Sequence, residues 1–179
     1  MLNPDHAMLV VIDVQGKLAE LAWRAEAIQK NIRILVEGMK VLEVPVVATE
    51  QYPKGLGPTV PSIAEILGDA PVIEKDTFSC CGDFAFEKHM LEIHKTDVIV
   101  CGIETHVCVY QTTRDLLALG YNVHLVTDAV SSRTEENWRL GIDVCAELGA
   151  KKTGTEMVLF EMLQRSGTEQ FKAISKLVK

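Results

Sequence analysis

Short apolar runs that alternate with segments of helical periodicity are the feature that most constrains the fold of this chain. The clearest run is Val98–Cys101, which is uninterrupted and which Gly102 ends. An uninterrupted run is typical of a strand buried on both faces of a parallel sheet. We therefore expect a central parallel strand here, followed by a helix from about Val107 to Leu119 with Gly120 as its left-handed cap.

The same alternation extends along the whole chain. The predicted strands are Met8–Ile12, Val44–Thr49, Pro71–Glu74, Val98–Cys101, Asn122–Thr127 and Ala150–Thr153. Helical periodicity separates them, most clearly where Ile28, Ile32, Leu35, Val36 and Met39 share one face. Regular alternation of strands and helices predicts an α/β fold, with a doubly wound six-stranded parallel sheet and right-handed crossovers. Its 179 residues, 47% of them apolar, predict a single domain over residues 1–179.

Local signals mark several element boundaries. Asp83 and Thr134 each precede a helical pattern and are predicted N-caps. The segment Glu50–Pro61 contains three prolines and two glycines, so we expect an irregular loop there.

Charge and hydropathy exclude several classes of partner. The formal net charge is −7, the pI is near 5.2, and no run of Lys or Arg occurs. This balance argues against nucleic acid and anionic membranes and favours a small-molecule substrate. The apolar run Ala7–Ile12 is too short to span a membrane and lacks the flanks of a signal peptide. We expect a cytoplasmic protein.

The five cysteines predict reduced thiols rather than disulfides or a metal site. They are Cys80, Cys81, Cys101, Cys108 and Cys145, an odd number with no C-x-x-C pair and no zinc spacing. Side chains of adjacent residues usually diverge, so we do not expect Cys80 and Cys81 to be bonded to each other. We expect no metal and no cofactor.

Cys108 is the candidate nucleophile because it falls in the first turn of the predicted helix. Unpaired backbone N–H groups and the positive end of the helix dipole favour a thiolate there and can hold an oxyanion. The alternative is a small buried core residue, which is the commoner role of a cysteine. A strand-turn-helix step at the carboxyl edge of a parallel sheet is where ligands bind in this architecture, which favours the functional interpretation.

Two charged residues share that edge. Asp13 comes directly after the first predicted strand and Lys75 directly after the third. Because parallel strands all end on one side of the sheet, we expect both side chains to lie near Cys108. The alternatives are a carboxylate that caps its own loop and a lysine that is solvated at the surface.

Four motifs give the chain a specific resemblance. They are VVIDVQ at Val10–Gln15, EKDTFSC at Glu74–Cys80, CGIETHVCV at Cys101–Val109 and VTDAVSSR at Val126–Arg133. Together they resemble the isochorismatase-like cysteine hydrolase superfamily, which includes nicotinamidases and N-carbamoylsarcosine amidohydrolases. The resemblance extends from about Met8 to Leu163. The segment Thr49–Gly57 looks most like the isochorismatase-domain subgroup.

The resemblance implies a three-layer fold with a six-stranded sheet and a catalytic triad of Asp13, Lys75 and Cys108. It also implies a cis peptide bond between Ile103 and Glu104, which would direct the Glu104 N–H toward an oxyanion hole shared with the Cys108 N–H. The implied activity is metal-independent hydrolysis of a small amide, carbamoyl or related carbonyl compound through a Cys108 acyl-enzyme. Related proteins are commonly homo-oligomers, so we expect a dimer or a larger assembly.

The chain departs from two branches of that superfamily. Nicotinamidases carry metal-binding Asp and His residues after the second strand, where this chain has Glu50, Gln51 and Tyr52. Isochorismatases proper cleave a vinyl ether without a thiol nucleophile. Both departures favour metal-independent acyl chemistry at Cys108.

Several alternatives stay open at this stage. His106 competes with Asp13 for the role of the base that deprotonates Cys108. Cys80 is a candidate partner that would resolve an oxidised Cys108. A binding or scaffold protein with little turnover is the rival function, and a thiol redox protein is a third. The residues expected to line the substrate pocket are Gln15, Trp23, Tyr52, Phe78, Thr105 and His106.

Overall fold

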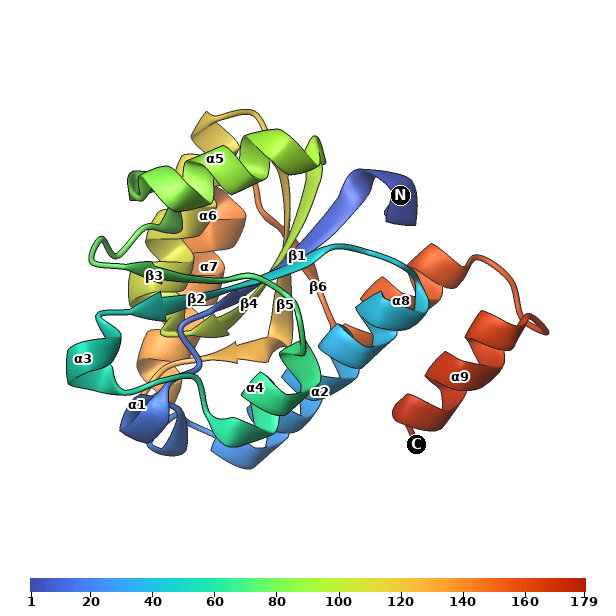
Figure 1. Ribbon diagram of the computed structural model, residues 1–179, viewed down its shortest axis with the longest axis horizontal. Coiled ribbons are helices and arrows are strands. Elements are labelled where there is room, and N and C mark those ends of the chain that lie inside the picture. The colour runs from blue at the N-terminus through green and yellow to red at the C-terminus, as the bar shows by residue number, and fades with distance from the viewer.

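The six strands form one parallel sheet in the computed structural model, which describes residues Met1–Lys179 (Figure 1). The strand order is β3-β2-β1-β4-β5-β6, and every neighbouring pair is parallel. The strands are β1 (Ala7–Ile12), β2 (Val46–Gln51), β3 (Val72–Lys75), β4 (Asp97–Ile103), β5 (Asn122–Ser131) and β6 (Lys151–Thr153). The predicted doubly wound α/β sheet is confirmed. The strand order reverses direction between β1 and β4, where folds of this kind bind ligands.

Helices cover both faces of the sheet and complete three layers (Figure 1). They are α1 (Gly16–Glu20), α2 (Ala25–Val41), α3 (Pro53–Leu56), α4 (Pro61–Leu67), α5 (Phe84–Ile93), α6 (Tyr110–Ala118), α7 (Glu135–Glu147), α8 (Thr155–Leu163) and α9 (Glu169–Leu177). One core joins the sheet to α2, α4, α8 and α9, and the other joins it to α5, α6 and α7. No helix is both long and apolar enough to cross a membrane.

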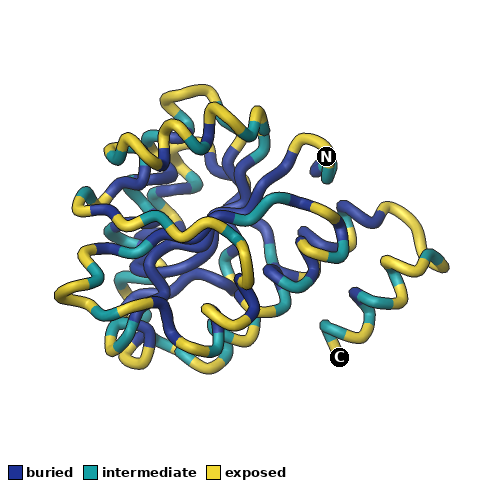
Figure 2. Tube along the Cα trace, viewed as in Figure 1, coloured by how far each residue is buried: buried dark blue, intermediate teal, exposed yellow.

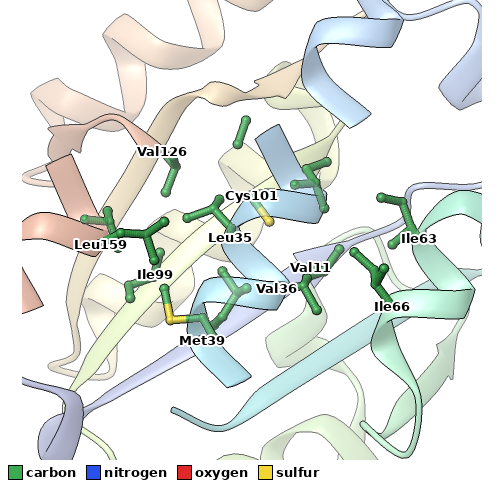
Figure 3. Close-up of a cluster of buried hydrophobic side chains, with 14 of the residues drawn as sticks. Val11, Leu35, Val36, Met39, Ile63, Ile66, Ile99, Cys101, Val126 and Leu159 are labelled. Atoms are coloured by element: carbon green, nitrogen blue, oxygen red, sulfur yellow. The ribbon is translucent and has the colours of Figure 1, made fainter. Parts of the chain in front are cut away.

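Strand β1 supplies both cores by alternation of its side chains. Ala7, Leu9 and Val11 belong to the core under α2, whereas Met8 and Val10 belong to the core under α5 and α6. Figure 3 shows the first core, where side chains from α2, α4 and α8 meet those of the sheet. The burial map shows the consequence, since the central strands are buried and the outer faces of the helices are exposed (Figure 2). The uninterrupted apolar runs therefore mark strands covered on both sides.

The predicted N-caps are confirmed by hydrogen bonds. The Asp83 carboxylate accepts from the N–H groups of Ala85 at 2.8 Å and Phe86 at 3.2 Å. The Thr134 hydroxyl accepts from the N–H of Asn137 at 3.2 Å.

Several predicted boundaries were wrong. Gly102 does not end the central strand, because β4 continues through it to Ile103. Strand β5 continues past Thr127 to Ser131, because a register shift between Val100 and Gly102 of β4 restores its pairing. The segment Glu50–Pro61 is not wholly irregular, since Pro53 begins the short helix α3. The helix after β4 begins earlier than predicted, with a π-helical turn at Thr105–Val109 that leads into α6.

Candidate active site

Asp13, Lys75 and Cys108 lie together where the strand order reverses. Asp13 follows β1, Lys75 is the last residue of β3, and Cys108 lies in the Thr105–Val109 turn after β4. Their exposed fractions are only 1%, 3% and 7%. We call these three residues the edge cluster. Gly102 permits the close packing beside it, because a Cβ at that position would overlap the backbone of Ile12.

Lys75 and Asp13 form a buried ion pair. Lys75 Nζ lies 2.7 Å from Asp13 Oδ2, and both side chains are almost fully excluded from solvent. Lys75 Nζ also donates to Gln51 Oε1 at 2.7 Å and to the carbonyl oxygens of Thr77 at 3.1 Å and Phe78 at 3.3 Å. An ammonium group has three hydrogens, so four acceptors leave it none for a ligand. Lys75 therefore acts on this site through its charge and its hold on Asp13.

The other oxygen of Asp13 has a partner that sequence analysis missed. Thr49 Oγ1 donates to Asp13 Oδ1 at 2.7 Å, and the Cys80 thiol lies 3.7 Å from Thr49 Oγ1. Both carboxylate oxygens are thus fixed from opposite sides. The sequence signal for Thr49 was its place near the end of β2, beside the strand that carries Asp13.

Cys108 rests as a thiol near a buried carboxylate. Burial raises the pKa of the Cys108 thiol, the Asp13 carboxylate raises that pKa further, and Lys75 lowers it. Asp13 is thus close enough to the thiol to influence its ionisation. The expected resting thiolate is therefore wrong for this closed site. The carboxylate next to the sulfur is placed to accept its proton.

The Thr105–Val109 turn is fixed from two directions. The Ile103–Glu104 peptide bond is cis, as the resemblance implied. The Glu104 carboxylate accepts from the N–H of Arg133 at 3.1 Å and from Arg133 Nε at 3.0 Å. The N–H of Glu104 donates no hydrogen bond within the chain. From the other side, a Cβ on Gly141 of α7 would lie 2.7 Å from the carbonyl carbon of Thr105.

Two of the predicted pocket residues are fully buried. Gln15 is fully buried, and its Nε2 donates to the carbonyl oxygens of Gln51 at 3.1 Å and Gly57 at 2.7 Å. Its Oε1 accepts from the N–H of Gln51 at 2.6 Å. Gln15 therefore braces the segment after β2 and does not line an open pocket. Thr105 is also fully buried, and its hydroxyl has no hydrogen-bond partner.

The other four predicted pocket residues lie nearer the surface. Trp23 stacks against Trp138 with ring centroids 4.6 Å apart. His106 Nδ1 lies 3.0 Å from Ser132 Oγ, so its partner is a hydroxyl, whereas the carboxylate beside Cys108 belongs to Asp13. Tyr52 and Phe78 are exposed over 59% and 55% of their surface.

None of the five main surface hollows includes Cys108. The largest, of about 600 Å³, lies between α7 and the end of β6 and includes no member of the edge cluster. A hollow of about 340 Å³ reaches Lys75 past Tyr52, Asp76 and Asp83. This second hollow includes one member of the edge cluster, Lys75, although the Lys75 side chain itself is closed to solvent.

The side chains at the end of β2, where nicotinamidases carry their metal ligands, are occupied by hydrogen bonds within the protein. Glu50 Oε1 accepts from the N–H of Thr59 at 2.6 Å and from its hydroxyl at 2.7 Å. Gln51 is bonded to Lys75 through Oε1 and to the carbonyl oxygen of Asp76 through Nε2 at 2.9 Å. No group of three or more His, Cys, Asp or Glu side chains is arranged to hold a metal ion.

Comparison with protein families places the chain. The family model described as the isochorismatase domain matches residues 7–157. The chain belongs to the isochorismatase family. The secreted isochorismatase effector Isc1 of Phytophthora sojae is 40% identical over 183 residues, covering 99% of this chain and 87% of its own length. Isochorismatase domain-containing protein 2 of Xenopus laevis is 34% identical over 178 residues, covering 99% and 85%.

Solved structures agree with this family and with the fold. The MAR1 ribonuclease of Caenorhabditis elegans has a TM-score of 0.93 and 38% identity, covering 99% of this chain and 91% of its own. YcaC of Escherichia coli, described as an octameric hydrolase of unknown specificity, has a TM-score of 0.93 at 23% identity, covering 98% and 88%. The second likeness shows the fold alone. The chain thus has the fold of the isochorismatase-family hydrolases.

Proposed function

We propose that this isochorismatase-family protein is a metal-independent cysteine hydrolase that acts on a small amide, carbamoyl or related carbonyl compound. The observation that carries the proposal is the buried Asp13 carboxylate, whose two oxygens are held by Lys75 and Thr49 at the sheet edge where Cys108 also lies, close enough to raise the pKa of that thiol. A thiol with its own fixed base is the arrangement that nucleophilic catalysis requires.

In the proposed reaction Cys108 is the nucleophile and Asp13 the general base. Asp13 accepts the thiol proton as Cys108 Sγ attacks the carbonyl carbon, which gives a tetrahedral oxyanion. The N–H groups of Glu104 and Cys108 are the proposed oxyanion hole. Asp13 returns the proton to the leaving amine as the C–N bond breaks and leaves a thioester. Water, deprotonated by Asp13, then releases the acid and regenerates the thiol. Lys75 keeps the Asp13 charge in place throughout.

The proposed substrate is small and not a polymer. The edge cluster is almost closed to solvent, and the net charge of −7 disfavours a polyanion. One similar solved structure is described as a ribonuclease, so RNA is the alternative substrate and is included in the test. We also propose a homo-oligomer, for which the octameric description of YcaC offers support.

The proposed compartment is a reducing one such as the cytoplasm, because all five cysteines are free. The Phytophthora sojae relative is named as secreted, which makes the compartment a separate experimental question. Fractionation of the source cells would answer it.

The test is a panel of primary amides, N-carbamoyl compounds, esters and a single-stranded RNA. Ammonia release, ester hydrolysis and RNA cleavage are followed for the native protein, Cys108→Ala and the control Cys145→Ala. We expect turnover of a small carbonyl compound that Cys108→Ala abolishes and Cys145→Ala retains, with an acyl adduct on Cys108 by mass spectrometry. Turnover that survives in Cys108→Ala overturns the mechanism. No turnover and no adduct across the panel favours a binding or scaffold protein.

A further inference from the structure

Thr49 is attached to Asp13 at two points. Strand β2 pairs with β1 so that Thr49 lies opposite Ile12, and the N–H of Asp13 donates to the carbonyl oxygen of Thr49 at 3.2 Å. The Thr49 hydroxyl then donates to Asp13 Oδ1 at 2.7 Å, and both residues are 1% exposed. A hydrogen bond from a hydroxyl to a buried carboxylate is charge-assisted and stronger than a neutral one. Thr49 therefore fixes both the backbone and the side chain of Asp13.

Cys80 fixes the hydroxyl in turn. Its Sγ lies 3.7 Å from Thr49 Oγ1, and its N–H donates to Thr112 Oγ1 at 3.0 Å. The hydroxyl has one hydrogen, which it gives to Asp13, so the thiol is the donor in the contact with Thr49. Burial raises the pKa of the Cys80 thiol to about 11, which keeps its proton in place. The donors thus run in one direction, from Cys80 through Thr49 to Asp13.

We propose that Thr49, oriented by Cys80, is a positioning residue that aims the Asp13 carboxylate at the Cys108 thiol. Lys75 alone holds Oδ2, and a carboxylate held at one oxygen can still turn about its terminal bond. The Thr49 hydroxyl holds Oδ1 and removes that freedom. This inference rests on the proposed function, because it assigns Thr49 a task only if Asp13 is the base.

A packing role for Thr49 makes a different prediction. Valine has nearly the volume of threonine and lacks the hydroxyl, and serine keeps the hydroxyl with less volume. If Thr49 only fills space, Thr49→Val preserves the site and Thr49→Ser disturbs it. If Thr49 positions Asp13, Thr49→Ser preserves the site and Thr49→Val disturbs it.

The experiment measures Cys108 alkylation by iodoacetamide against pH, mapped by mass spectrometry, together with turnover of any substrate found. In Thr49→Val we expect the midpoint of Cys108 alkylation to move to lower pH, because an Asp13 carboxylate that is free to turn away from the thiol raises the pKa of Cys108 less. Turnover should fall about tenfold to a hundredfold, as for the loss of a charge-assisted bond. Thr49→Ser should keep both values near those of the native protein.

Matched variants keep the test decisive. Cys80→Ser retains a hydrogen-bond donor to Thr49, and Cys80→Ala does not. If circular dichroism shows that Thr49→Val does not fold, these two variants replace Thr49→Ser and Thr49→Val in the comparison. If Asp13→Asn moves the alkylation midpoint while Thr49→Val and Cys80→Ala leave it unchanged, the positioning role is wrong and the proposed base stands. If Asp13→Asn leaves the midpoint unchanged, the proposed function itself fails.

Discussion

The Asp13 carboxylate raises the pKa of the Cys108 thiol that it faces, whereas Lys75, bonded to the same carboxylate, lowers it. Charge explains both signs, since a nearby anion disfavours the thiolate and a nearby cation favours it. The two residues that we propose as catalytic partners therefore act on the acidity of Cys108 in opposite directions.

Removal of the Asp13 charge and removal of the Lys75 charge should shift the pKa of Cys108 in opposite directions, although both should abolish turnover. In Asp13→Asn the midpoint of Cys108 alkylation should move to lower pH, and in Lys75→Met it should move to higher pH. Both variants should lose turnover, because one lacks the base and the other lacks the residue that holds it. The measurement is iodoacetamide labelling against pH with peptide mass spectrometry.

Cys145 is the internal control for that measurement. Its pKa is raised to about 11 by burial, and neither Asp13 nor Lys75 contributes. Its labelling profile should be the same in all three proteins. Shifts of Cys108 in the same direction in both variants would contradict the electrostatic account.

The buried ion pair should show strong coupling in stability. Removal of one partner leaves an uncompensated buried charge, so Asp13→Asn and Lys75→Met should each lower the free energy of unfolding by about 3–5 kcal/mol. The double variant should be less destabilised than the sum of the two. Urea unfolding of the four proteins completes a double-mutant cycle, and additive losses would mean that the pair is not coupled.

Gly141→Ala should displace the turn that carries Cys108. The added Cβ would meet backbone atoms of Thr105 and His106 at 2.7–2.8 Å, and backbone cannot move aside as a flexible side chain can. We expect a loss of about 1–3 kcal/mol in stability and an altered rate of Cys108 alkylation. Gly38→Ala in α2 is the control, because its Cβ meets only the side chain of Leu159. That variant should leave Cys108 alkylation unchanged.

His124 should make the fold sensitive to acid. Burial lowers the pKa of His124 below its ordinary value of 6.5, although the hydrogen bond to Asp97 opposes that shift. The unfolded chain therefore binds a proton before the folded chain as pH falls, and folding loses free energy below about pH 6.5. His124→Gln should lose less stability than the native protein between pH 7.5 and 5.5 in urea unfolding. Parallel losses would show that His124 does not contribute.

Local rules were sufficient to predict the framework of this fold. Apolar runs such as Val98–Cys101 identified buried strands, and Asp83 and Thr134 marked helix starts, because each signal depends on residues close in sequence. The proximity of Asp13, Lys75 and Cys108 followed from one topological fact, that parallel strands end at the same edge. The roles of these residues in a reaction stay predictions.

Contacts between distant segments were beyond the same reasoning. The Gln15 side chain braces Gln51, and the Thr49 hydroxyl bonds Asp13, through side-chain directions that appear only once the strands are in register. The extension of β5 to Ser131 depends on an irregularity in β4, a different strand. The protonation of Cys108 was mispredicted because position in a helix was known and burial beside a carboxylate was not.

The edge cluster is divided between two halves of the sheet. Asp13 and Lys75 come from the half formed by β1, β2 and β3, whereas Cys108 follows β4, and the halves meet along the β1–β4 ladder. Neither half contains the proposed nucleophile together with its proposed base. Two fragments cut in the connection between α5 and β4 would each lack the complete site, and only their reassembly would restore it. The acidity of one thiol thus reports whether the two halves of the molecule have docked.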